Sequence, residues 1–98
     1  MIDLDHYYDT PKDICLETAR KAVLRRKALH ISQKELAGMT GVSFASIRRF
    51  ETTGQISFES LVKIAISIDM KEDVKNLFNE RKVYRTIQDV IDEANQKR

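Results

Sequence analysis

The side chains with the clearest chemistry in this sequence are basic, and they are concentrated in its middle third. Residues 20–50 hold eight Lys or Arg and one acid, Glu35, a net charge of +7. Residues 1–19 hold one basic and five acidic side chains (−4), and residues 51–98 hold eight basic and nine acidic ones (−1). A concentrated basic region is typical of a surface that meets phosphates, although a solvated helix face can have the same composition.

Residues that could catalyse a reaction or bind a metal have simpler interpretations. Cys15 is the only cysteine, so it can form neither an intramolecular disulfide nor a paired-cysteine zinc site, and on an apolar helix stripe we expect it in the core. His6 and His30 have no second ligand at metal-binding spacing. No nucleophile has a base and an orienting partner suggested by the sequence, and the acids at 89–93 fit a solvated helix face. We expect no enzyme activity, no metal and no cofactor.

Length and composition favour one small helical domain. The chain has 98 residues, of which 42% are hydrophobic and 33% charged, with only three Gly and one Pro. Helix formers dominate, so the expected fold class is all-α. No apolar run approaches the ~20 residues of a membrane span, the acidic start lacks the basic region of a signal peptide, and one cysteine suits a reducing compartment. We therefore expect a cytoplasmic protein without a membrane partner.

Capping signals predict where the helices begin. The expected order is a flexible arm over residues 1–9, a five-helix domain over residues 10–79 and a helical tail over residues 80–98. Small polar residues mark the helix starts, with an acid three positions later at the first, second and last of them. These N-caps are Thr10, Ser32, Ser43, Ser57 and Thr86. The first helix is expected to run to about Ala28, the second from Gln33 to about Met39, the third over 44–52, and the fifth over 71–78.

The apolar residues repeat at helical spacing and indicate which faces are buried. In the first helix the inward stripe is expected to contain Cys15, Ala19, Ala22, Val23 and Arg26. In the fourth helix it is expected to contain Leu61, Ile64, Ala65 and Ile68. The tail carries a narrower stripe of Ile87, Val90, Ile91 and Ala94, which could pack on the domain, lengthen a dimer or bind a protein partner.

The second and third helices have the pattern of a helix-turn-helix. Ala37 is the small residue where two helices approach, and Gly41 follows four residues later in the turn. Val42, Ile47 and Phe50 are the apolar residues that pack the second helix of such a motif onto its domain. Because several independent positions agree, the pattern is specific.

The run from Gln33 to Glu51, QKELAGMTGVSFASIRRFE, resembles the phage-repressor-like (Xre/Cro-type) helix-turn-helix family. The resemblance covers roughly residues 18–78. It implies a compact five-helix repressor-like domain, here with an additional C-terminal helix. It also implies a regulator that dimerises and inserts its third helix into the major groove of a palindromic double-stranded DNA operator. Residues 48–57, RRFETTGQIS, look like those of HipB-like antitoxins, which are encoded beside HipA-type kinases and repress their own operons.

The resemblance also implies which side chains contact DNA. Base contacts would come from the third helix, through Phe44, Ala45 and Arg49. Arg49 could donate bidentately to guanine, whereas Phe44 and Ala45 can make only apolar contacts such as those with thymine methyls. Many relatives have polar residues where Phe44 stands. Contacts with phosphate, or with either part of the DNA, would come from Gln33, Ser43, Ser46, Arg48, Thr53 and Gln55.

Two further roles follow from the same resemblance. Arg26 and Glu51 match a largely buried ion pair that joins the first helix to the end of the third. Val74, Leu77 and Phe78 would lie in a homodimer interface. Arg25 and Lys27 are expected in solvent or beside phosphate. Both Ser43 and Ser46 could serve as caps or as phosphate ligands, and the sequence leaves the two roles open.

A protein of another class fits the same pattern. A protein-interaction module could keep the helix-turn-helix shape without reading DNA, and an apolar Phe44 would then mark its protein-facing surface. The leading interpretation is a sequence-specific transcriptional regulator, with an autorepressing antitoxin paired with a HipA-like kinase toxin as the favoured subtype. Salt separates the two classes, because DNA binding weakens steeply with salt and an apolar contact does not.

Overall fold

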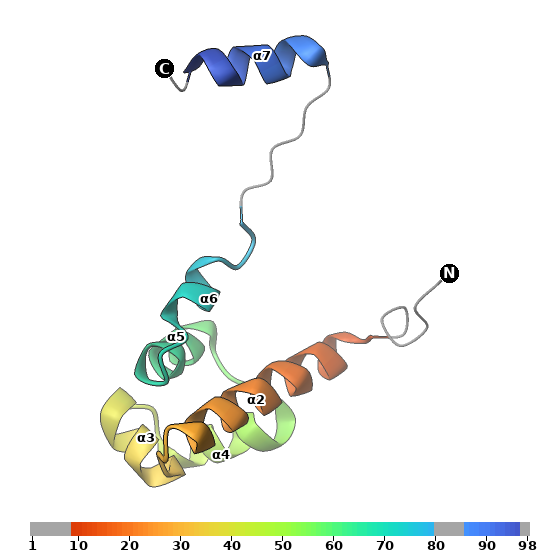
Figure 1. Cartoon of the computed structure of the whole chain (residues 1–98). Coiled ribbons are helices and arrows are strands. Elements are labelled where there is room, and N and C mark those ends of the chain that lie inside the picture. Colours follow the sequence, from red (N-terminus) through yellow and green to blue (C-terminus); the bar gives the residue numbers. More distant parts are fainter. Residues whose placement is uncertain (1–8, 80–85, 97–98) are drawn as a thin grey trace.

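In a computed structural model, the chain is described over residues 9–79 and 86–96. Within these ranges it contains six α-helices and no strand, which confirms the all-α class (Figure 1). The helices are α2 (Pro11–Ala28), α3 (Gln33–Thr40), α4 (Phe44–Thr53), α5 (Phe58–Ser67), α6 (Lys71–Lys75) and α7 (Ile87–Gln96). Residues 1–8 of the expected N-terminal arm lie outside the described ranges. No helix in the described part is long and apolar enough to cross a membrane.

The predicted N-caps form the expected hydrogen bonds. The Thr10 and Ser32 hydroxyls accept from the amides of Asp13 and Glu35, whose carboxylates accept from the Thr10 and Ser32 amides in return. The bonds from Thr10, first from its amide and then from its hydroxyl, lower the pKa of Asp13. Three more caps join Ser43 to Ser46, Ser57 to Ser60 and Thr86 to Asp89. Local polar residues therefore determine where these helices start.

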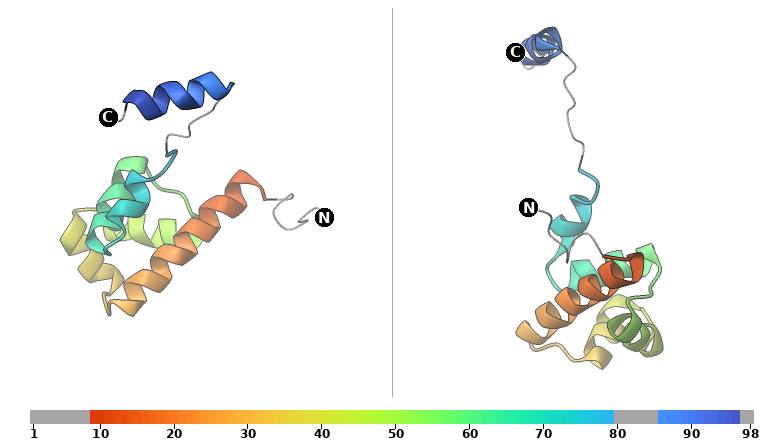
Figure 2. Two further views of the ribbon diagram at one scale, coloured as in Figure 1. Left: turned by 45° about the horizontal axis from the view of Figure 1, so that its top comes forward. Right: turned by 90° about the vertical axis from the view of Figure 1, so that its right-hand side faces the viewer.

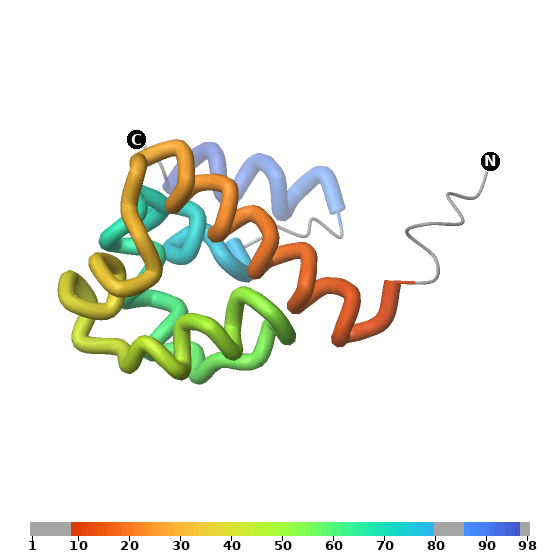
Figure 3. The backbone as a smooth tube through the Cα atoms, turned by 90° about the horizontal axis from the view of Figure 1, so that it is seen from below, coloured from red at the N-terminus to blue at the C-terminus, as the bar shows by residue number. Residues whose placement is uncertain are grey.

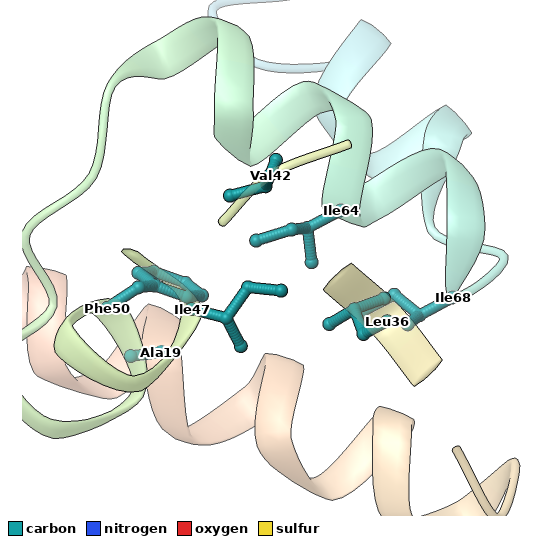
Figure 4. Packing of buried hydrophobic residues seen from close by; sticks show 7 residues of the cluster. All are labelled: Ala19, Leu36, Val42, Ile47, Phe50, Ile64 and Ile68. Carbon is teal, nitrogen blue, oxygen red and sulfur yellow. The ribbon is translucent and has the colours of Figure 1, made fainter. Parts of the chain in front are cut away.

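The hydrophobic core lies where α2, α3, α4 and α5 meet. Figure 4 shows its side chains pointing toward one another from these helices and from the turn after α3: Ala19, Leu36, Val42, Ile47, Phe50, Ile64 and Ile68. Ile47 and Phe50 are at most 2% exposed, so one side of α4 is held firmly in the domain. The opposite side of α4 is thereby turned outward.

The turn between α3 and α4 has the geometry of a helix-turn-helix. Gly41 ends α3 with φ of +76°, and its amide donates to the carbonyl of Ala37. Only glycine adopts this left-handed conformation without a steric cost. Seen from below in Figure 3, α3 and α4 follow each other along one side of the domain, with α2 running beside them.

The expectation that Cys15 packs in the core is wrong, because its side chain is exposed. The reason lies in the residue that faces it. Gly54, at the end of α4, comes so close that an added Cβ would lie 2.7 Å from the Cys15 carbonyl carbon and 2.9 Å from its Cβ. A glycine brings backbone rather than a side chain to this place, and among the described residues the Cys15 side chain is exposed.

The fifth helix is shorter than expected. α6 ends at Lys75 instead of continuing to residue 78, and the chain turns at Leu77 and Phe78. Leu77 is half exposed and Phe78 is fully exposed, with φ of +52°, a conformation that costs energy for a bulky residue. These two side chains lie on the surface of the described protein.

Helix α7 lies apart from the other helices, as two further views make clear (Figure 2). Its apolar stripe is exposed, with Ile87 at 80% and Val90 and Ile91 at 46% each. A helix of ten residues is too short to be stable alone in water. The stripe is therefore a surface that a stable α7 must bury.

Candidate nucleic-acid interface

Helix α4 presents polar and basic side chains on the face that the core does not use. Ala45, Ser46, Arg48 and Arg49 are exposed, and Phe44 is half-buried at the first position of the helix. Because Ile47 and Phe50 fix the other face, these side chains project together from one rigid surface. An α-helix of this kind is the element that fits the major groove of DNA.

Phe44 is flanked by two cations. The Nζ atom of Lys34 lies 5.9 Å from the centre of the Phe44 ring, and the Cζ atom of Arg48 lies 5.6 Å from it. Such contacts are attractive because the ring face carries negative charge density. They bring positive charge from α3 and α4 to the N-terminal end of α4. Arg48 could be foreseen at this place, four residues after Phe44 on one helix, whereas no local signal in the sequence indicates Lys34.

Ser43 and Ser46 form hydrogen bonds with each other at the start of α4. The Ser43 hydroxyl accepts from the Ser46 amide at 3.1 Å and donates to the Ser46 hydroxyl at 2.8 Å. This geometry assigns the capping role to Ser43. Both hydroxyls are still exposed at the helix N-terminus, where the helix dipole favours an anion.

Arg49, Thr53 and Gln55 come together at the other end of α4. The Arg49 guanidinium donates to the Gln55 side-chain oxygen. The Thr53 hydroxyl donates to the Arg49 carbonyl at 2.7 Å and accepts from the Gln55 amide at 3.1 Å. The exposed Arg49 guanidinium therefore has one hydrogen-bond partner in the loop that follows its helix.

A surface depression of about 280 Å³ lies beside this group. Its lining includes Ser46 and Arg49 from α4, Gln55 from the loop, and Ser57 and Ser60 from the start of α5. A guanidinium, an amide side chain and a helix N-terminus all favour an anionic oxygen. The depression has the chemistry of a phosphate contact.

Behind this surface, Arg26 and Glu51 form a bidentate ion pair. The Arg26 Nε and Nη2 atoms lie 2.8 Å from the two Glu51 carboxylate oxygens, and both side chains are only 9% exposed. Arg26 also donates to the Ile31 carbonyl at 2.9 Å. The pair ties α2 and the turn after it to the C-terminal half of α4.

Gln33 belongs to the same cluster. Its side-chain amide donates to the Glu51 carboxylate at 2.8 Å, and its expected contact with a DNA phosphate stays a prediction. Arg25, expected in solvent or beside phosphate, also has a structural partner. Its Nε donates to the Ile68 carbonyl at 3.0 Å and its Nη2 lies 3.1 Å from the Asp69 carboxylate, so it caps the end of α5. Both partners are distant in sequence, which is why local patterns did not indicate them.

Residues 24–74 match the model of the helix-turn-helix family. The match spans 51 of the 98 residues, and the chain belongs to this family. Within it the chain is of the Xre/Cro type, whose members are DNA-binding transcriptional regulators. No curated protein and no solved structure matched the chain.

Proposed function

We propose that this protein is a sequence-specific transcriptional regulator that binds a palindromic operator as a homodimer and reads it with α4. The observation that carries this proposal is the outer face of α4. There, Lys34 and Arg48 both lie within 6 Å of the centre of the Phe44 ring, and Arg49 donates to Gln55. Positive charge and a guanidinium on a rigid helix are what recognition of DNA in the major groove requires.

In this proposal the side chains have separate tasks. Arg49 donates to a base, with guanine as the preferred partner, while Phe44 and Ala45 make apolar contacts with base edges. Contacts with the phosphate backbone come from polar and basic residues around them: Lys34, Ser43, Ser46, Arg48, Thr53 and Gln55. Gln33 acts by holding Glu51, and so it positions α4 indirectly.

The exposed apolar residues beyond α5 support the homodimer. Val74 is half-buried, Leu77 is half exposed and Phe78 is fully exposed, so this segment offers apolar surface to a partner. A two-fold dimer would place two copies of α4 about one turn of DNA apart, each facing one half-site.

The rival proposal, a protein-interaction module, is less well supported by the surroundings of Phe44. Two cations within 6 Å of the ring centre give this surface a positive character rather than a purely apolar one. The test is binding of the purified protein to its own upstream DNA and to a scrambled duplex across a salt series. Specific binding that falls steeply with salt supports the regulator, and absence of preference at every salt concentration supports the module.

We also propose the antitoxin subtype, in which the protein represses its own operon and neutralises a HipA-like kinase. This proposal is supported by the likeness of residues 48–57 to HipB-like proteins. Its test is co-expression with a neighbouring kinase-like reading frame. Growth arrest that is relieved by this protein supports the subtype, and arrest that persists while the protein is produced rejects it.

A further inference from the structure

An apolar groove of about 290 Å³ lies between α2, α5 and α6, away from the DNA-reading surface. Ala22 of α2, Leu61 and Ala65 of α5, Val74 of α6 and Leu77 after it contribute to its lining. No residue of α4 lines it. A partner could therefore fill this groove while α4 is bound to DNA.

The same chain carries a helix that needs such a groove. The apolar stripe of α7, formed by Ile87, Val90, Ile91 and Ala94, is exposed in the described structure. These residues recur at three- and four-residue steps and so occupy one side of the helix. A short helix with one apolar side is the usual occupant of a hydrophobic groove.

We propose that α7 of one copy docks in this groove of a second copy, so that the dimer exchanges its C-terminal helices. This inference rests on the dimer proposed above, and interface size favours it. α6 has only five residues, whereas a stable protein–protein interface engages roughly 20–30 residues on each side. If α7 docked in the groove of its own copy, it would cover Val74 and Leu77, and these residues could no longer contact the second copy. If α7 docks in the groove of the other copy, its contacts with Val74 and Leu77 are contacts between the two copies, and its ten residues add to the interface.

The length of chain before α7 permits the exchange. Eight peptide steps separate Asn79, the last described residue after α6, from Ile87. At about 3.3–3.6 Å per residue, they span at most roughly 26–29 Å, more than the roughly 15 Å length of a ten-residue helix. A tether of this length does not confine α7 to the groove of its own copy.

Charge on α2 favours the approach of α7. α7 carries three acids, Asp89, Asp92 and Glu93, and no basic residue, a net −3. α2 carries six basic and two acidic side chains, and without Arg25 and Arg26, which pair with acids of other elements, its net charge is +2. The groove lining itself is balanced, with Lys21 of α2 and Asp73 of α6. Long-range attraction therefore acts between α7 and α2 as a whole, and the contact within the groove is apolar.

The exchange is tested by crosslinking two versions of the chain that differ in size, so that each can be recognised in the crosslinked product. Cys15 is first replaced by Ser in every chain, which removes the only native thiol. One copy then carries Thr18→Cys on the groove lining and the other carries Ala94→Cys on the α7 stripe, and the mixture is treated with a short bis-maleimide. The matched control carries Gln96→Cys, which lies on the side of α7 opposite the stripe. Light scattering reports the oligomeric state, and binding to the upstream duplex is measured in parallel.

The expected result is a crosslinked heterodimer with Ala94→Cys that is lost with Gln96→Cys. A chain carrying both Thr18→Cys and Ala94→Cys, diluted into excess Cys15→Ser protein, separates the alternatives. An internal crosslink in that chain overturns the exchange in favour of docking within one copy. A dimer without any groove crosslink overturns the exchange but leaves the dimer. If the protein is a monomer and still binds the upstream duplex specifically, the exchange and the dimer are both overturned, and the proposal that the protein recognises DNA stands.

Discussion

Gly54, at the C-terminal end of α4, lies directly against the backbone of Cys15 in α2. A Cβ at position 54 would lie 2.7 Å from the carbonyl carbon of Cys15 and 2.8 Å from its carbonyl oxygen, and Gly54 itself has φ of +79°. This contact and the Arg26–Glu51 ion pair fix the C-terminal half of α4 on α2 at two points. The orientation of the DNA-reading helix therefore depends on residues that do not touch DNA.

The three glycines should respond differently to replacement by alanine. Gly54→Ala combines a left-handed conformation with a clash against backbone, and we expect it to lower stability by about 3 kcal/mol. Gly41→Ala has the same conformational strain but open space around it, and about 1 kcal/mol is expected. Gly38→Ala, inside α3 with open space, should raise stability by about 0.5–1 kcal/mol. Urea denaturation measures all three, and equal effects of Gly54→Ala and Gly41→Ala would contradict the close contact.

Removing one partner of the Arg26–Glu51 pair should destabilise the fold. Arg26→Ala leaves the Glu51 carboxylate buried without its cation, and a loss of about 3–5 kcal/mol is expected. Lys27→Ala is the matched control, because Lys27 is exposed on the same helix, and its effect should stay within about 0.5 kcal/mol. Loss of DNA binding in Arg26→Ala should accompany loss of helical signal, whereas a folded Arg26→Ala that cannot bind DNA would assign Arg26 to the contact surface.

The first turn of α2 should respond to acid. Hydrogen bonds from Thr10 lower the pKa of Asp13 below its ordinary value of 3.8, so the carboxylate is stabilised in the folded chain. The stability that the Asp13 carboxylate contributes is fully present above the pKa of Asp13 in the unfolded chain, and it is lost as the pH falls through the lower pKa of the folded chain. Asp13→Asn should therefore lower the thermal midpoint at neutral pH and have no effect once Asp13 is protonated. A deficit of the variant that persists in acid would contradict this account.

Arg48 should contribute to affinity rather than to sequence preference. Arg48→Ala removes one cation beside Phe44 and is expected to weaken binding to specific and scrambled duplexes alike, with a salt slope reduced by about 1. Lys75→Ala serves as the control, since Lys75 lies on α6, which packs against α5. Fluorescence anisotropy across a salt series measures both variants. An Arg48→Ala variant that changed only the preference among sequences would show base contact instead.

Helix starts and most of the core followed from the sequence because their signals are local. Ser32 with Glu35, and Thr10 with Asp13, are capping pairs three residues apart, and Ile47 and Phe50 repeat at helical spacing. What the sequence could not indicate are contacts between distant residues. Lys34 lies over Phe44, and Arg25 binds the end of α5, only because the fold brings these elements together.

Cys15 shows the same limit. Periodicity placed it on the inward stripe of its helix, yet its side chain is exposed, and the residue that faces its backbone is Gly54. Gln33, predicted to contact phosphate, has a partner that local patterns did not indicate, the Glu51 carboxylate. In both cases the neighbour across the packing interface is distant in sequence.

Selection from a random duplex library shows whether α4 reads a base sequence with Arg49 on guanine. The wild-type protein should enrich a palindromic motif with one guanine in each half-site that Arg49→Ala no longer requires. Arg49→Ala should keep its helical signal and the rest of the motif. Lys75→Ala should select the same motif as the wild type. If the folded wild-type protein enriches no motif, α4 does not read a base sequence, and if the motif is unchanged with Arg49→Ala, Arg49 does not contact guanine.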